Sequence, residues 1–291
     1  MIMGTLAFPD PENSVRAWNP PQLTTPVVLS VPHAGIATAG FEDALVPHLD
    51  VRCDADLFVD RLYGVSESRT DLDYEMTRAL PYVVARTSRF VCDMNRHPDD
   101  VTAAIVPAHP APRNTDGRGF VWAVTTTGSP ALRHPLALAE WEARQHIHQA
   151  YYAAIRHALT RARAQFGFAV LIDGHSMPSV GRKGHKDTGQ VRADVVPGDR
   201  DGTSCSGVLS SAVGKHFLER GFSVAFNDPY KGGFITTHHG QPHNGIHAIQ
   251  IELRRDLYMD ESAYAPIAEG FRRISQTLVE LIERVSRFRP V

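Results

Sequence analysis

Four residues of the types that zinc hydrolysis needs occur at or near the ends of apolar runs. His33 follows VVLSVP, with Asp56 a short way downstream, His175 follows AVLIDG, and Glu252 closes AIQIE. Two neutral imidazoles and one carboxylate leave one position of a tetrahedral zinc ion open for water. A further carboxylate can then take a proton from that water. These residue types therefore predict metal-dependent hydrolysis.

The two histidines also have ordinary structural explanations. His33 lies in SVPHAG, where a histidine in a turn can simply bond a backbone carbonyl. His175 follows Asp173 by two residues, so the two can form a structural pair. The same carboxylate can instead orient the imidazole of a metal ligand from behind. Sequence alone leaves both explanations open for each histidine.

Glu252 is harder to explain by structure alone. A carboxylate within the apolar run IQIEL needs a cleft, a partner or a buried salt bridge, for example to Arg254 or Arg255. Burial would raise its pKa, which suits a group that takes a proton from water and later donates it. We therefore expect Glu252 to be the catalytic acid–base.

The third metal ligand has three candidates close together in the chain. Asp56 and Asp60 are four residues apart and share one face of the helix that we predict over 54–64, and Asp54 precedes them. An acidic face exposed to solvent is the alternative. The residues alone do not choose among the three.

Asn95 and Arg96 follow the run VCDM and form a potential grip for a substrate carboxylate. Arginine offers a two-pronged donor and asparagine a neutral one. The alternative is that Arg96 pairs structurally with Asp93 or Asp99. A substrate with a second carboxylate would need another cation, for which Arg192, Lys231 and Arg254 are the candidates.

Other motifs carry less chemistry. The histidines 238, 239, 243 and 247 lack the HExxH pattern, and nearby glycines and a proline disfavour a helix, so we expect loop residues that line the site. Ser176 is a conceivable nucleophile, but its surroundings, DGHSMP, lack the GxSxG elbow. Neither a GxGxxG after a strand nor a GK[ST] loop occurs, so a nucleotide cofactor is not expected.

Composition excludes several classes of protein. The chain has 291 residues with a net charge of −2 and 21% charged residues, which argues against a nucleic-acid-binding protein. Three scattered cysteines give no disulfide framework and favour a reducing compartment. The start of the chain lacks the pattern of a signal peptide, and no apolar stretch is long enough to cross a bilayer. We expect a cytoplasmic protein without membrane contact.

Short apolar runs alternate with helical patterns. We expect strands at 27–31, 82–86, 90–93, 169–172, 222–226 and 248–253, and helices at 54–64, 134–166, 206–220 and 264–288. Residues 1–26 are expected to form an irregular arm, and 98–130, 178–203 and 228–247 to form loops. This order predicts one α/β domain over 1–291, a three-layer αβα sandwich with ligands beyond the carboxyl ends of its strands.

Several of these segments together resemble the N-formylglutamate amidohydrolase family. The matching motifs are SVPHAG, DLFVD, VCDMNRHP, LIDGHSMPS, GDRDGTSC, NDPYKGG and HAIQIELRRDLYMDE. The resemblance implies a fold like that of zinc carboxypeptidases and aspartoacylase-like deacylases, with a mixed sheet and one zinc ion. It implies His33, Asp56 and His175 as ligands, Glu252 as acid–base, and Asn95–Arg96 at a substrate carboxylate.

Three functions remain open. The first is hydrolysis of N-formyl-L-glutamate to formate and L-glutamate, a step of histidine degradation, with a small-molecule substrate as the only partner. The second is a zinc-dependent deacylase or peptidase that acts on another N-acyl amino acid; a bulky Tyr230 or Phe234 near the metal would favour formyl instead. The third is a non-catalytic protein that binds a metal or an amino acid. Divalent metals other than zinc also suit such ligands, and the oligomeric state is left open.

Overall fold

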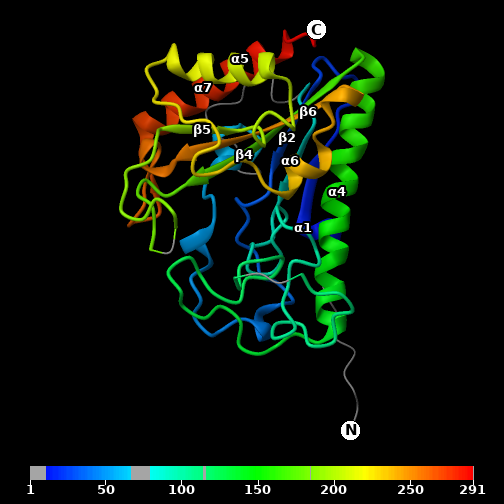
Figure 1. The fold of residues 1–291 in the computed structure, drawn as a ribbon, viewed down its shortest axis with the longest axis vertical. Helices are drawn as coiled ribbons and strands as arrows, with labels where there is room; N and C mark the ends of the chain where they lie inside the picture. Colours follow the sequence, from blue (N-terminus) through cyan, green and yellow to red (C-terminus); the bar gives the residue numbers. More distant parts are fainter. Residues whose placement is uncertain (1–10, 67–78, 114–115, 184, 291) are drawn as a thin grey trace.

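The computed structural model describes residues 11–66, 79–113, 116–183 and 185–290, in which six strands form one mixed sheet (Figure 1). The order across the sheet is β1-β3-β2-β4-β6-β5. The strands are β1 (Val15–Trp18), β2 (Val27–Val31), β3 (Tyr82–Ala85), β4 (Ala169–Met177), β5 (Val195–Gly198) and β6 (Ile246–Arg254). The four inner strands are parallel, and the two edge strands run antiparallel to their neighbours.

Helices cover both faces of this sheet (Figure 1). The helices are α1 (Pro11–Ser14), α2 (Val59–Leu62), α4 (Leu138–Phe166), α5 (Gly207–Leu218), α6 (Phe234–His239) and α7 (Ala268–Ser286). Short 3-10 turns span Glu42–Ala44, Val51–Asp54, Pro242–Asn244 and Arg255–Leu257, and β7 (Met259–Asp260) pairs with β8 (Ala265–Pro266).

Alternation along the strands divides the core into two layers. On β2, Val27 and Leu29 face the cluster that contains α5 and α7, whereas Val28 faces the cluster that contains α4. The α4 layer buries Trp141, Ile147, Tyr151, Ile155 and Leu159 on one face of that helix. The predicted three-layer αβα sandwich is therefore confirmed.

The parallel inner strands bring the predicted chemistry to one edge of the sheet. His33 lies just beyond the end of β2, and His175 and Glu252 lie near the carboxyl ends of β4 and β6. His175 is the register partner of Glu252, so the two side chains start from neighbouring backbone positions. Carboxyl ends of parallel strands are the usual place for a site in such a sheet.

Some predicted elements are wrong. Residues 90–93 form turns instead of a strand, because Val91 and Asp93 bond to Ser88 and to the distant Phe120. Residues 222–226 make only a single bridge, between Val224 and Val195. The predicted loop 178–203 contains the edge strand β5, and the loop 228–247 contains α6.

Two further corrections concern the amino-terminal part of the chain. Asp56 does not lie on a helix: it falls between a 3-10 turn and α2, where its N–H bonds to His33 O at 2.9 Å. Of the predicted arm 1–26, residues 15–18 are strand β1, which pairs with β3 at the edge of the sheet, and residues 1–10 lie outside the described residues.

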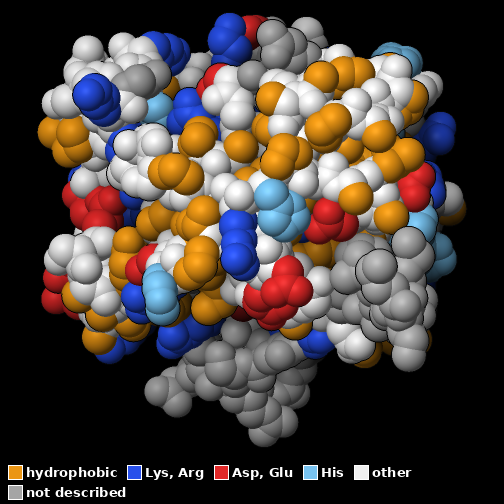
Figure 2. All heavy atoms as spheres, turned by 90° about the horizontal axis from the view of Figure 1, so that it is seen from below, with side chains coloured by type: hydrophobic (Ala, Val, Ile, Leu, Met, Phe, Trp, Pro, Cys, Tyr) orange, Lys and Arg blue, Asp and Glu red, His pale blue; other side chains and the backbone are white. Residues whose placement is uncertain are grey.

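The surface carries mixed charge. Figure 2 shows a face on which the coloured basic, acidic and histidine side chains are interspersed with hydrophobic ones, without dominance of one sign among the residues described. Cys53, Cys92 and Cys205 are free thiols. None of the described helices combines the length and the apolar character that crossing a membrane requires.

Candidate metal centre and active site

His33, Asp56 and His175 meet in one buried group, with one ligand atom from each within 4.8 Å of the others. Each residue is only 2% exposed. Both histidines turn Nδ1 toward the same carboxylate oxygen, Asp56 Oδ2, at 3.5 Å for His33 and 3.2 Å for His175. Two nitrogen donors and one oxygen donor at these spacings could hold a metal ion. We refer to His33, Asp56 and His175 as the metal group.

The other two candidates for the third ligand are occupied elsewhere. Asp54 accepts hydrogen bonds from Thr126 and Arg182. Asp60 is half-buried and interacts with Ser66, and its partial burial raises its pKa. Of the three aspartates, Asp56 is the one that the structure brings to the two histidines.

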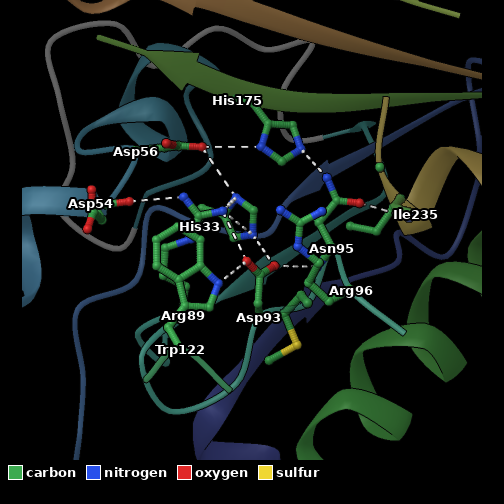
Figure 3. Close-up of polar contacts among 12 residues, drawn as sticks. His33, Asp54, Asp56, Arg89, Asp93, Asn95, Arg96, Trp122, His175 and Ile235 are labelled. Carbon is green, nitrogen blue, oxygen red and sulfur yellow. Dashed lines mark hydrogen bonds and ion pairs between the residues drawn. The ribbon is translucent and has the colours of Figure 1, made fainter. Parts of the chain in front are cut away.

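A second carboxylate contacts the Nε2 atom of each imidazole, and Figure 3 shows this for Asp93 and His33. Asp93 Oδ1 lies 2.7 Å from His33 Nε2, and Asp173 Oδ2 lies 2.9 Å from His175 Nε2. Asp93 is in turn fixed by the indole N–H of Trp122 at 3.0 Å, and Asp173 by the hydroxyl of Ser30 at 2.7 Å. A carboxylate on Nε2 leaves the lone pair on Nδ1, which is the arrangement a metal-binding histidine requires.

Arg255 fixes the remaining oxygen of Asp56. Its Nη2 donates to Asp56 Oδ1 at 2.9 Å, and its Nε donates to Ser176 Oγ at 3.2 Å. Burial alone would raise the pKa of Asp56, but the two histidines and Arg255 hold it well below its usual range. The carboxylate is therefore ionised and presents a single free oxygen to the histidines.

The buried charges fit a divalent cation. Asp56, Asp93, Asp173 and Glu252 supply four carboxyl groups, and the guanidiniums of Arg89 and Arg255 offset two negative charges. Burial alone would lower the pKa of His175, but Asp173 and Asp56 raise it well above its usual value, so without a metal it carries a proton. A metal ion would displace that proton and neutralise the remaining charge.

Arg89 lies directly against His33. Arg89 Nη2 is 3.0 Å from Nδ1 and 3.2 Å from Nε2 of the ring, so the guanidinium is within hydrogen-bond distance of the imidazole. It places a positive charge beside the metal group, where an oxyanion would need one.

Glu252 has the environment of a proton-transfer group. It is 7% exposed, and burial raises its pKa to about 7, although the nearby His175 favours the ionised form. Gln250 Nε2 donates to its Oε1 at 2.9 Å, which fixes the carboxylate within the cavity. A pKa near neutrality lets one carboxyl group act first as base and then as acid.

A cavity of about 480 Å³ connects these residues. Its volume lies in the usual range for small-molecule sites. It is lined by the metal group, Glu252, and the predicted substrate residues Asn95, Arg96 and Lys231. Ser176 also faces it, but this hydroxyl accepts from Arg255, which does not suit a nucleophile that needs a base.

Most hydrogen-bonding groups of the Asn95 side chain are used within the protein. Its Oδ1 accepts from Ile235 N at 2.9 Å, and its Nδ2 donates to Gln250 Oε1 at 3.3 Å. The second N–H points at His175 Nε2 at 3.4 Å, a nitrogen that Asp173 already engages. Asn95 therefore keeps one N–H for a ligand, and the guanidinium of Arg96 lies beside it (Figure 3).

Other predicted residues lie elsewhere. Arg254 is not among the residues found to line the cavity, because β6 ends there and its guanidinium pairs with Asp194 and Asp256. Arg192 pairs with Asp187 and lies over the ring of Tyr230. The four histidines are also corrected: His238 and His239 pack against Tyr152, His247 bonds to Ser206, and His243 lies in a 3-10 turn.

Sequence reasoning missed Arg89 and Gln250, and treated Asp93 only as a partner for Arg96. Asp93 carried the clearest signal, since it is a carboxylate in the run FVCDM directly before Asn95. Arg255 was considered as a partner of Glu252 but binds Asp56 instead. Arg89 and Gln250 had no distinctive sequence context, and only the fold shows their positions.

Comparison with known proteins agrees with this site. The family model for N-formylglutamate amidohydrolase matches residues 25–259. This chain belongs to that family. A relative from Pseudomonas putida named N-formylglutamate deformylase is 31% identical over 260 residues, which cover 88% of this chain and 90% of that protein. A second relative named N-formylglutamate deformylase, from Pseudomonas aeruginosa, is also 31% identical over 264 residues, which cover 88% of this chain and 91% of that protein.

Solved structures support the same assignment. The crystal structure of N-formylglutamate amidohydrolase from Ralstonia eutropha superposes with a TM-score of 0.81 at 30% identity, and covers 94% of this chain and 97% of that one. A gene product of Agrobacterium tumefaciens shares the fold, with a TM-score of 0.59 at 20% identity and coverage of 92% and 95%. The carboxylate-anchored histidines therefore lie in an amidohydrolase fold.

The anchoring carboxylates yield a first prediction. Asp93→Asn or Asp173→Asn should weaken zinc binding by about 10- to 100-fold, because an amide holds the imidazole less firmly and does not raise its basicity. Titration of the metal-free protein with zinc against a chelating indicator measures this. Asp54→Asn, which alters a buried aspartate that contacts Thr126 and Arg182, is the matched control and should bind zinc like the wild type. Equal affinity in all three variants would contradict the anchoring role.

The raised pKa of Glu252 yields a second prediction. In the metal-free protein this carboxyl group keeps its proton more tightly when folded, so stability is lost as pH rises from 4.5 to about 7. Glu252→Gln removes that loss, so its free energy of unfolding relative to wild type should rise by roughly 2 kcal/mol between pH 5 and pH 8. Urea unfolding at both pH values measures the difference.

The control for that experiment is Glu142→Gln, at an exposed position of α4. Its stability should follow that of the wild type at both pH values. A Glu252→Gln difference that is independent of pH would show that the folded protein does not perturb this group.

Proposed function

We propose that this protein hydrolyses N-formyl-L-glutamate to formate and L-glutamate, with zinc held by His33, Asp56 and His175. The observation that carries the proposal is the position of Glu252, a buried carboxyl group with a pKa of about 7 beside two histidines and an aspartate. Membership of the amidohydrolase family and the names of its relatives support the choice of substrate. Zinc suits the mixed nitrogen and oxygen donors.

Each residue then has a role in the reaction. A bound zinc ion would supply a Lewis acid that acidifies water and polarises the formyl carbonyl. Glu252 accepts a proton from water as the oxygen bonds to the formyl carbon, and then gives that proton to the nitrogen as the C–N bond breaks. Arg89, beside His33, donates to the carbonyl oxygen as it becomes negative. Formate and the free amine of glutamate leave.

The cavity residues near the metal group orient the substrate. Arg96 and the free N–H of Asn95 bind the carboxylate next to the scissile amide, because Asn95 itself contacts His175. Lys231 lines the same cavity but forms an ion pair with Asp201, and about half of its side chain is exposed. We therefore place Lys231 at the margin of the substrate site.

The test of this function is formate release. Purified protein loaded with zinc should release formate from N-formyl-L-glutamate, lose this activity on chelation and regain it with zinc. Glu252→Gln should lower kcat by about 10³-fold while the protein retains its zinc, because the variant loses its proton carrier but no metal ligand. A zinc-loaded variant with wild-type activity would exclude Glu252 as the acid–base. Zinc-loaded wild type without formate release would contradict the substrate.

The second candidate function is hydrolysis of a longer N-acyl amino acid, which the cavity volume allows. Tyr230 opposes it, because this bulky ring lines the same cavity as Glu252. Phe234, the other bulky residue expected there, instead packs against His97 and Tyr152. Tyr230 is therefore the residue that limits the size of the acyl group.

The corresponding prediction compares two acyl groups on one amino acid. Wild type should prefer N-formyl- over N-acetyl-L-glutamate by at least about tenfold in kcat/KM, since one misplaced methyl group costs that much in a closed pocket. Tyr230→Ala should reduce this preference, mainly through increased activity on the acetyl substrate. Tyr264→Ala, which removes a tyrosine outside the cavity lining, is the control. An unchanged ratio in Tyr230→Ala would assign acyl selection to another residue.

A further inference from the structure

Two arginines that face the cavity have no acidic partner in the described structure. The six lysines and arginines found to line it are Arg89, Arg96, Arg118, Lys186, Arg200 and Lys231. Four of them form ion pairs, with Asp93, Asp116, Asp228 and Asp201 respectively. Among the described residues, no carboxylate lies within ion-pair distance of Arg96 or Arg200. Their charges are therefore available to a ligand.

The loop that carries Arg200 is rigidly held just beyond the edge strand β5. Asp199 accepts hydrogen bonds from Ser210 Oγ at 2.6 Å, Asn227 Nδ2 at 2.8 Å and Gly202 N at 2.9 Å. Arg200 itself takes a left-handed backbone conformation with φ of 58°, and its N–H donates to Lys231 O at 2.8 Å. A loop tied at so many points presents its side chain without further ordering on binding.

A hydrogen bond and close packing also fix the direction of the Arg200 side chain. Its Nη1 donates to Gly232 O at 3.2 Å, which uses one of its five N–H donors and leaves the others. The chain packs closely along Gly232, where an added Cβ would lie 3.3 Å from Arg200 Cδ and 2.5 Å from Thr236 Oγ1. A glycine is needed here for the guanidinium to follow this path, and also because φ is 104°.

Gly233, the next residue, lies against Asn95 and so brings Arg96, the other arginine without an ion pair among the described residues, to the same wall of the cavity. A Cβ on Gly233 would lie 2.4 Å from the side chain of Asn95, the residue before Arg96. The Gly232–Gly233 segment therefore lies between Arg200 on one side and Asn95–Arg96 on the other. Asn95 contacts His175, which puts Arg96 at the end of this wall next to the metal group, whereas the Arg200 guanidinium contacts Gly232 on the other side of the segment.

We propose that Arg200 binds the side-chain carboxylate of the N-formyl amino acid and thereby selects glutamate over neutral residues. This inference rests on the proposed function and specifies how the substrate is recognised. In N-formylglutamate the α-carboxylate is attached to the carbon that bears the amide, and the side-chain carboxylate is two carbons farther away. Arg96 next to the metal group and Arg200 on the other side of the segment match this order, and a guanidinium binds a carboxylate with two parallel hydrogen bonds.

The experiment compares N-formyl-L-glutamate with N-formyl-L-glutamine, which has nearly the same shape but a neutral side chain. Wild type should strongly prefer the glutamate substrate. Arg200→Gln should lower kcat/KM for N-formyl-L-glutamate by about 100-fold, mainly through KM, and change kcat/KM for N-formyl-L-glutamine by less than about threefold. Arg200→Lys, which keeps the charge but not the two-pronged geometry, should recover part of the loss.

Arg118→Gln is the matched control, since Arg118 lines the same cavity but is paired with Asp116. It should change kcat/KM for the two substrates by the same factor. Circular dichroism and zinc content should be unchanged in all variants. Equal losses on both substrates in Arg200→Gln, or no loss on either, would overturn the role of Arg200 while wild-type formate release still supports the proposed function. A wild type that releases formate from neither substrate would contradict the proposed function, and this inference with it.

Discussion

A carboxylate buried from water is stable only when charged or polar partners replace its hydration, and the site depends on how Asp56 meets this condition. Arg255 binds one of its oxygens, and the two histidines face the other. Several hydrogen bonds and charges together offset the cost of burial. If Arg255 were absent, Asp56 could rotate or take a proton, and the oxygen that both imidazoles face would no longer be fixed.

The parallel sheet supplies the spacing that this arrangement needs. Strands β2 and β4 are neighbours, so the histidines near their ends lie side by side with ring centroids 4.9 Å apart. Strand β6 follows β4 in register, which brings Glu252 beside His175. Gln250, two residues earlier on the same face of β6, ties Glu252 to Asn95. Glu252, Gln250, Asn95 and His175 thus form one connected network of contacts.

The sequence predicted the residues at strand ends and failed where distant segments meet. His33, His175 and Glu252 could be found because each ends or interrupts an apolar run, a signal that is local. Asp93 and Arg255 could not be assigned, because their contacts with His33 and Asp56 span 60 and 199 residues of chain. Arg254 and Arg255, both considered as partners of Glu252, pair with aspartates instead. The strand ends at Arg254, and the following 3-10 turn directs Arg255 back to Asp56.

The residues proposed for the reaction and those proposed for substrate selection lie on different parts of the fold. Glu252 and His175 lie within the strands, and His33 lies just beyond one; their positions follow from the sheet register and tolerate little change. Arg200 and Tyr230, which also line the cavity, lie on loops held by hydrogen bonds and glycines instead of by the sheet. These loops can vary in sequence without displacing the two histidines and Glu252, because the strands that position those residues are fixed by two buried cores. A related protein can therefore keep the hydrolytic centre and change its acyl amino acid by substitutions on these loops alone.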